Sequence, residues 1–365
     1  MKPSHVALSI LLTVIARPLF AAESCQAVFL EPARALEVSE KSLLTSEQYE
    51  ALLKSVDALL GDLAVPNGVH IKIAEPGVGG LYSRKTNDII VMSSFLKYPS
   101  GKGNHPKYST AILSHEYGHA IFDKNMRELS PSWNALEIES VTILERSNKA
   151  TKAYMDAIDT AVRATTPQEK AEAEVVKSKA LEEMMAAGKR MSQLLKMRDV
   201  SSAYHELFAD TVAVVRFQDP RIIFNALSGN ALIKDQLKYY QDPKTKEAVK
   251  FSEKDLIRIN IENRQFDKSW GEAHFQQWLK DINGTIANKS LHPYLLLAPT
   301  RAALWDVIRN KVKNPHEQKH ILTKLVQVLR KHYEENFKDA EAAQNIDPVK
   351  FNQSLISEIQ QMYSK

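Results

Sequence analysis

Residues 110–122 read Thr-Ala-Ile-Leu-Ser-His-Glu-Tyr-Gly-His-Ala-Ile-Phe, and this stretch predicts a buried helix with a metal site on one face. Apolar residues flank His115 and His119 on both sides, which is typical of a helix packed inside a protein. Two histidines four residues apart on a helix project from the same face, one turn from each other, and can share a metal ion. Glu116 completes the pattern H-E-x-x-H.

This pattern predicts a zinc centre with a general base beside it. Neutral imidazole nitrogens are zinc ligands, and a catalytic zinc keeps one coordination position for water. A glutamate next to the first histidine can accept the proton of that water. We therefore expect His115 and His119 to bind Zn²⁺, Glu116 to act as the base, and the reaction to be hydrolysis of a peptide bond.

A second copy of the pattern, at residues 316–320, provides an internal control. Pro315 places its first histidine in the opening turn of a helix. Lys319 lies between the two histidines, where a cation opposes metal binding. We expect the second copy to belong to a solvated helix surface, which is usual for charged amphipathic segments.

A second apolar helix, expected from Ala203 to Val215, carries Glu206 and Asp210 four residues apart on one face. H-E-x-x-H at 115–119 followed by Glu206-x-x-x-Asp210 resembles the gluzincin metallopeptidases, whose third zinc ligand is a glutamate on a second helix. The resemblance implies that Glu206 is the third ligand. It also implies that Asp210 accepts a hydrogen bond from a ligand histidine.

The second histidine pair is also followed by a matching acid pair, Glu335-x-x-x-Asp339. No glycine or proline lies between His320 and Glu335, so these fifteen residues predict one rod about 22 Å long. A rod cannot return its far end to a metal held at its start, whereas Glu206 follows a chain reversal. The sequence therefore predicts Glu206 at about 2 Å from the ion, and Glu335 far away.

His292-Pro293, followed by Arg301, resembles the His-Pro and arginine element downstream of the zinc site in the CAAX-prenyl-endopeptidase branch of the gluzincins. Attack on a carbonyl builds negative charge on its oxygen, and a histidine or tyrosine donor commonly helps zinc to stabilise it. We expect His292 to reach the active site as this donor. The alternative is a histidine that only caps or packs, and Tyr204 and His105 are the next candidates.

Residues 1–22 have the layout of a secretory signal peptide, with an apolar run from Val6 to Ile15 and small residues ending at Ala22. We therefore expect an exported protein. We expect it to be periplasmic or secreted and not held by a transmembrane helix, because no later stretch approaches the roughly 20 apolar residues that such a helix needs. Cys25 lies just past the expected cleavage site, which makes lipid attachment a second possibility. Glu23 fits a lipoprotein signal poorly.

The charge of the chain gives no support to a nucleic-acid-binding function. The net charge is +4, and it falls to +2 without residues 1–22, which contain two basic residues and no acid. A single cysteine cannot form an internal disulfide, so the fold depends on core burial and, where one binds, on a metal. The partner that we expect is a protein or peptide substrate.

The segments of the mature chain predict an α+β fold that is predominantly helical. Residues 23–65 read as an N-terminal helical segment, and residues 66–240 as a zincin-like gluzincin core with a small sheet. A long helical hairpin, residues 133–200, is inserted in this core, and a capping box at Thr166 divides its two helices. Residues 241–365 read as a helical C-terminal part.

The hairpin leaves a different class of function open. It could receive a partner protein or cover the cleft, or it could be simple architecture. A helical binding or scaffold protein with a structural metal site is therefore the alternative to an enzyme, and a metal-dependent hydrolase of another substrate is a third option. An intact Glu116 favours the enzyme, because a structural site needs no base.

Overall fold

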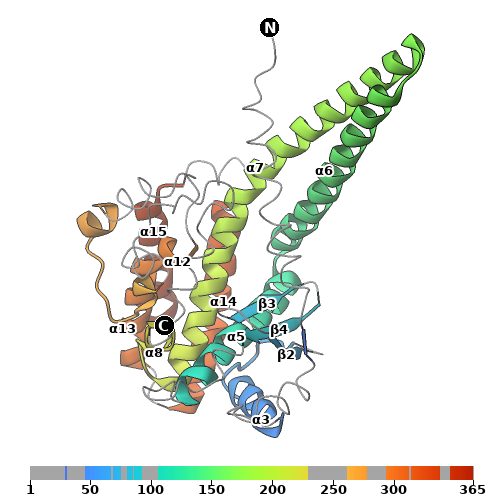
Figure 1. The fold of residues 1–365 in the computed structure, drawn as a ribbon. Coiled ribbons are helices and arrows are strands. Elements are labelled where there is room, and N and C mark those ends of the chain that lie inside the picture. The colour runs from blue at the N-terminus through green and yellow to red at the C-terminus, as the bar shows by residue number, and fades with distance from the viewer. Residues whose placement is uncertain are drawn as a thin grey trace. The chain divides into compact units, whose positions relative to one another are not determined.

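The computed structural model describes residues 29–30, 46–66, 69–74, 80–84, 86–92, 106–228, 261–277, 293–311, 314–337 and 346–364. Over these residues the fold is α+β and predominantly helical, as the sequence predicts (Figure 1). The chain forms two compact units. One contains residues 131–198, and the other contains residues 28–130, 199–338 and 345–365. The predicted signal peptide, Cys25, His105 and His292 lie outside the described residues.

The sheet of the larger unit has four strands in the order β1-β2-β4-β3. They are β1 (Phe29–Leu30), β2 (His70–Ala74), β3 (Gly80–Ser83) and β4 (Asp88–Met92). β2 and β4 run parallel, whereas β3 pairs antiparallel with β4 at the edge. Alternating and β-rich runs predict β2 and β4 correctly. β1 falls inside the segment expected to be helical, because two residues are too few for a periodicity to show.

Helix α5 (Pro106–Leu129) carries the H-E-x-x-H pattern and is buried from Ala111 to Asp123. It packs against β3, β4, α3 (Ser46–Asp57) and α8 (Ile222–Ser228). The Tyr117 hydroxyl donates to Asp57 Oδ1 at 2.6 Å, which fixes α5 to α3. This confirms the buried helix that its apolar flanks predict.

Helix α7 (Pro167–Phe217) is one continuous helix of 51 residues. The sequence analysis expected the hairpin to end before a separate helix from Ala203, and that break does not exist. The helix continues because residues 189–217 contain neither glycine nor proline, the residues that most disfavour a helix. The chain reversal lies before Pro167. There the predicted capping box forms, with Thr166 Oγ1 accepting from Glu169 N and Glu169 Oε2 accepting from Thr166 N.

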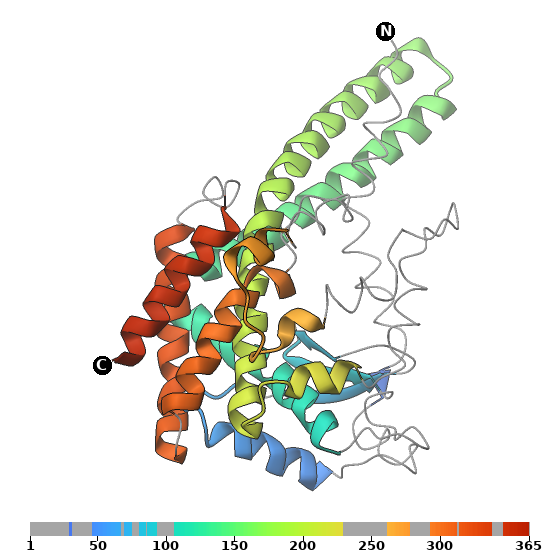
Figure 2. The same cartoon turned by 90° about the vertical axis from the view of Figure 1, so that its left-hand side faces the viewer.

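The smaller unit is the predicted helical hairpin, made by α6 (Pro131–Arg163) and the part of α7 up to Arg198. The two helices lie side by side in both views (Figure 1 and Figure 2). Buried alanines recur every seventh residue along α7, at Ala173, Ala180 and Ala187. Small residues at this spacing let two helix backbones approach closely. A bidentate ion pair between Arg190 and Glu139 links the helices outside this seam.

The C-terminal helices belong to the same compact unit as α5, although the sequence analysis treated residues 241–365 as a separate part. They are α12 (Pro293–Leu296), α13 (Ala298–Lys311), α14 (Pro315–Asn336) and α15 (Pro348–Ser364), preceded by the 3₁₀ turn η1 (Glu262–Arg264). α13 and α14 both pack on α15. The predicted cap of α15 is confirmed, since Asp347 Oδ1 accepts from the backbone of Val349.

A bilayer-spanning helix would have to be both long and apolar, and none of the helices in the described part of the chain meets both conditions.

Candidate metal centre

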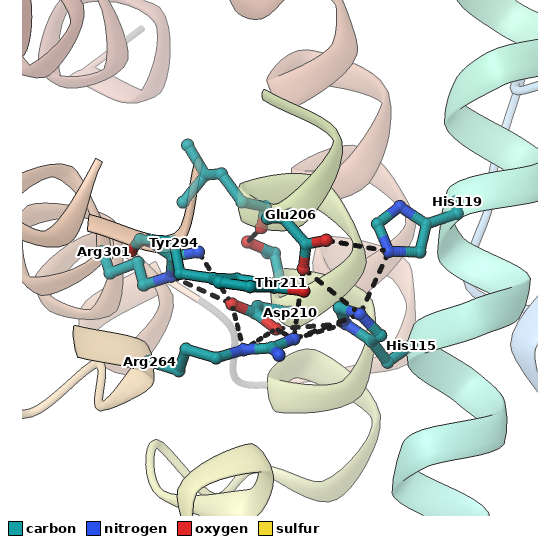
Figure 3. A network of polar contacts seen from close by, with 9 residues as sticks. His115, His119, Glu206, Asp210, Thr211, Arg264, Tyr294 and Arg301 are labelled. Carbon is teal, nitrogen blue, oxygen red and sulfur yellow. Dashed lines mark hydrogen bonds and ion pairs between the residues drawn. The ribbon is translucent and has the colours of Figure 1, made fainter. Parts of the chain in front are cut away.

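The structure brings together the three residues predicted as ligands (Figure 3). The Nε2 atoms of His115 and His119 lie 3.0 Å apart. Glu206, from α7, places Oε2 3.4 Å from His115 Nε2 and Oε1 3.6 Å from His119 Nε2. A tetrahedral zinc with bonds of about 2.0–2.1 Å separates its ligand atoms by about 3.3 Å. Two imidazoles and one carboxylate at these separations fit a zinc ion.

Asp210 is fully buried and orients one of these histidines. Its Oδ1 lies 3.0 Å from Nδ1 of His115, so Nε2 of that ring is the atom that faces Glu206 and His119. Nη2 of Arg264 also lies 3.1 Å from this Nε2, so a metal bound there has to displace the guanidinium. Burial raises the pKa of Asp210, but the charges of Arg264 and Arg301 outweigh it and hold the pKa well below its usual value. Asp210 is therefore an ionised acceptor at neutral pH, as the family resemblance implies for this position.

Two buried arginines from different segments neutralise Asp210. Arg301 on α13 donates from Nε to Oδ2 at 3.0 Å. Arg264, at the end of η1, donates from Nη2 to Oδ1 of Asp210 and to Oε2 of Glu206 at 3.3 Å. Arg301 belongs to the predicted His-Pro and arginine element, whereas no prediction from the sequence includes Arg264. No motif or spacing marks Arg264, because it lies 149 residues from His115 in a short turn.

Glu116 lies beside the ligands with only 5% of its surface exposed. Burial is the main cause that raises the pKa of Glu116 to about 7, and the charges of Glu206 and Asp210 act in the same direction. A carboxyl group with a pKa near 7 can both accept and return a proton at neutral pH. Glu116 therefore has the protonation behaviour of a general base.

The two histidines respond differently to this environment. Burial lowers the pKa of His119 to about 3, which keeps its ring neutral as a ligand must be. Burial and Arg264 also lower the pKa of His115, but its hydrogen bonds to Asp210 and Glu206 outweigh them and raise it to about 9. A metal that binds His115 at neutral pH has to displace a proton.

A tyrosine enters the site where the sequence analysis expected a histidine. His292 lies outside the described residues, but Tyr294, two residues later on α12, extends into the network (Figure 3). The Arg264 guanidinium lies 4.8 Å from the centre of its ring. The charge of Glu206 is the main cause that raises the pKa of Tyr294, so its hydroxyl stays protonated and can donate. No prediction from the sequence includes Tyr294, although it follows the His-Pro pair directly.

Tyr204, which the sequence analysis ranked after His292, is engaged elsewhere. Its hydroxyl lies 2.6 Å from Nδ1 of His332 on α14, and both side chains are fully buried.

The second H-E-x-x-H copy lies on α14, where His320 is exposed as expected. Glu335 is also exposed and lies 3.7 Å from Lys331.

The glycine inside the motif sets the distance between the two ligand-bearing helices. A Cβ atom at Gly118 would lie 2.8 Å from Cα of Ala209 on α7, closer than real Cβ contacts. Any larger residue would push α5 and α7 apart, because a backbone atom blocks the space. Gly118 thus allows His115 and His119 to lie within reach of Glu206.

Comparisons with protein-family models, curated proteins and solved structures find no match. Two groups of residues in the described part of the chain could each hold a metal ion, because the potential ligand atoms within a group all lie within 4.8 Å of one another. One group is His115, Glu116 and His119, and the other is His115, Glu206 and Asp210. The chemistry of this donor set and its separations are what point to a metal.

Proposed function

We propose that this protein is an exported zinc-dependent endopeptidase of the gluzincin type, periplasmic or secreted. The observation that carries the proposal is the convergence of His115, His119 and Glu206 beside a fourth group, Glu116, that a metal does not need as a ligand. The first three residues would hold the ion. When bound, zinc would supply Lewis acidity, which polarises a substrate carbonyl and lowers the pKa of water.

The role of Glu116 is to move one proton. It accepts a proton from the attacking water and then gives it to the amine that leaves when the peptide bond breaks. Its buried position supports this role, because burial raises its pKa to about 7. At neutral pH the carboxylate and the protonated carboxyl group then have similar populations, so Glu116 can both accept and return the proton.

The arginines keep the charge of the site close to neutral. Three acids, Glu116, Glu206 and Asp210, lie with Arg264 and Arg301 in one network of interacting charges. Buried charges are costly unless they are paired, and the two arginines pair with Asp210 in particular. Asp210 can then orient His115 without leaving a large uncompensated negative charge.

A peptide is the substrate that the surroundings of Glu116 support best. Strand β3 lies at the edge of the sheet, and α5 packs against it. An extended peptide can add to a sheet edge through main-chain hydrogen bonds. Gly80 of β3 adjoins the Glu116 carboxyl, so a peptide on this edge would run past the base.

Removal of the base tests the proposal against a structural metal site. We expect the mature protein to hold about one zinc per chain and to cleave members of a peptide library unless a chelator is present. Glu116→Gln should keep the metal and lose cleavage, because the change removes the base and no ligand.

Two outcomes would contradict this function. One is cleavage by Glu116→Gln at the rate of the parent protein. The other is a parent protein that cleaves nothing but loses thermal stability when zinc is stripped, which is the behaviour of a scaffold with a structural site.

A further inference from the structure

Gly80, the first residue of β3, lies directly against the side chain of Glu116. We propose that Gly80 is a positioning residue, whose missing side chain leaves the space that the Glu116 carboxyl occupies. The inference rests on the proposed function, since it concerns the residue expected to act as the base.

The contact leaves no room for a Cβ atom at position 80 while the Glu116 side chain keeps its position. A Cβ atom at position 80 would lie 2.6 Å from both Cγ and Cδ of Glu116 and still nearer to Oε1, whereas real Cβ atoms essentially never come below 3.0 Å. Gly80 is held in this place by its pairing with Val91 of β4, and α5 packs against both strands. The strand backbone therefore forms one wall around the carboxyl.

Backbone conformation does not explain the glycine at this position. Gly61 is the glycine with positive φ in the described part of the chain, and Gly80 has no such conformation. An alanine could adopt the backbone of β3 at this residue without strain. Space for Glu116 is the remaining reason for a glycine.

Gly80 and Gly118 differ in what a new side chain would meet. At Gly118 the obstacle is Cα of Ala209, which cannot move without the helix. At Gly80 the obstacle is the side chain of Glu116 from Cγ outward, which can turn about its own bonds. An alanine at position 80 would therefore leave the fold intact and move the carboxyl. A displacement of about 1 Å can cost about 100-fold in rate.

Gly80→Ala tests this inference with three measurements. We expect the melting temperature and the zinc content of the variant to equal those of the parent protein. We expect kcat to fall about 100-fold with little change in KM, because substrate binding is retained and the base is misplaced. A crystal structure of the metal-free variant should show the Glu116 carboxyl moved from its position beside β3.

Gly271→Ala is the matched control, because a Cβ atom at Gly271 meets nothing within 4 Å. It should behave as the parent protein in every measurement. Glu116→Ala provides the second background, since it lacks every Glu116 atom that the new Cβ atom would meet. Gly80→Ala should therefore cost much less, under about 5-fold in the residual kcat, in the Glu116→Ala background than in the parent protein.

An unmoved carboxyl in Gly80→Ala, or a parent-like kcat, would overturn the inference and leave the peptidase proposal standing. An equal loss of kcat in both backgrounds would also overturn it. A parent protein without peptidase activity would reject the function instead, and the crystal structure would still show whether Gly80 sets the position of Glu116.

Discussion

Side chains around the candidate metal centre have two roles: some orient the predicted ligands, and others compensate buried charge. Asp210 orients His115, and Arg264 and Arg301 compensate Asp210. In the proposed peptidase, Tyr294 is our candidate donor to the negative charge that builds on a substrate oxygen. It contacts Arg264, and its hydroxyl remains protonated because Glu206 is close.

Tyr294→Phe tests this role with the smallest possible change. Loss of one hydroxyl donor should lower kcat by about 100-fold and leave KM and zinc content close to those of the parent protein. Steady-state kinetics on one good peptide, with metal analysis of the same sample, measures all three quantities. An unchanged kcat would exclude Tyr294 as the donor and return attention to His292.

At the scale of elements, the site depends on how closely α5 and α7 approach each other. Gly118 faces Ala209 at the crossing, with no room for a Cβ atom. The crossing brings the histidines of one helix to the carboxylates of the other. Its geometry is therefore a condition for metal binding and not only for stability.

Gly118→Ala should weaken zinc binding and destabilise the fold together. The methyl group would overlap a backbone atom, and overpacking of this kind costs about 1–3 kcal/mol. We expect a lower melting temperature and a zinc affinity reduced by at least 10-fold in a competition assay with a metal-binding dye. Gly271→Ala should change neither quantity, and parent-like zinc affinity in Gly118→Ala would contradict the role given to the crossing.

Local signals in the sequence predicted most of the elements. Apolar flanks predicted α5, and capping residues predicted the starts of α7 and α15. The H-E-x-x-H context distinguished the buried residues 115–119 from the copy on α14, whose His320 is exposed. Two features were not predicted, one because it depends on a contact between distant residues and the other because it depends on the absence of a signal. Arg264 reaches Asp210 from 54 residues away, and the continuity of α7 follows from the absence of a helix breaker.

At the scale of the whole chain, the larger unit buries a polar pair between α7 and α14. Tyr204 of α7 and His332 of α14 share a hydrogen bond, and both are fully buried. Burial lowers the pKa of His332 from 6.5 to about 4. Folding therefore requires a neutral ring between pH 4 and pH 6.5, where the unfolded chain binds a proton.

The consequence is a loss of stability in acid. Below pH 6.5 the unfolded state takes up a proton that the folded state does not, so the free energy of unfolding falls as the pH drops toward 4. The contribution of His332 is at most about 3 kcal/mol. Urea unfolding of the parent protein and of a Tyr204→Phe/His332→Leu variant, at pH 7.5 and pH 5, measures it.

The double variant removes both partners of the buried bond, so neither polar group is left alone. We expect the parent protein to lose more stability than the variant between the two pH values. Equal losses would show that His332 does not contribute to the pH dependence. Other buried histidines, such as His205, contribute equally to both proteins and cancel in the difference.

The continuity of α7 restricts how the length of this chain can change in evolution. Each residue inserted in an α-helix turns everything before it by about 100° relative to everything after it. Hairpin residues and Glu206 share this one helix. An insertion or deletion between Glu206 and Asp210 of this helix would therefore turn one of the two acids away from His115. Length variants that survive should instead gain or lose whole seven-residue repeats on both sides of the turn at residues 164–166.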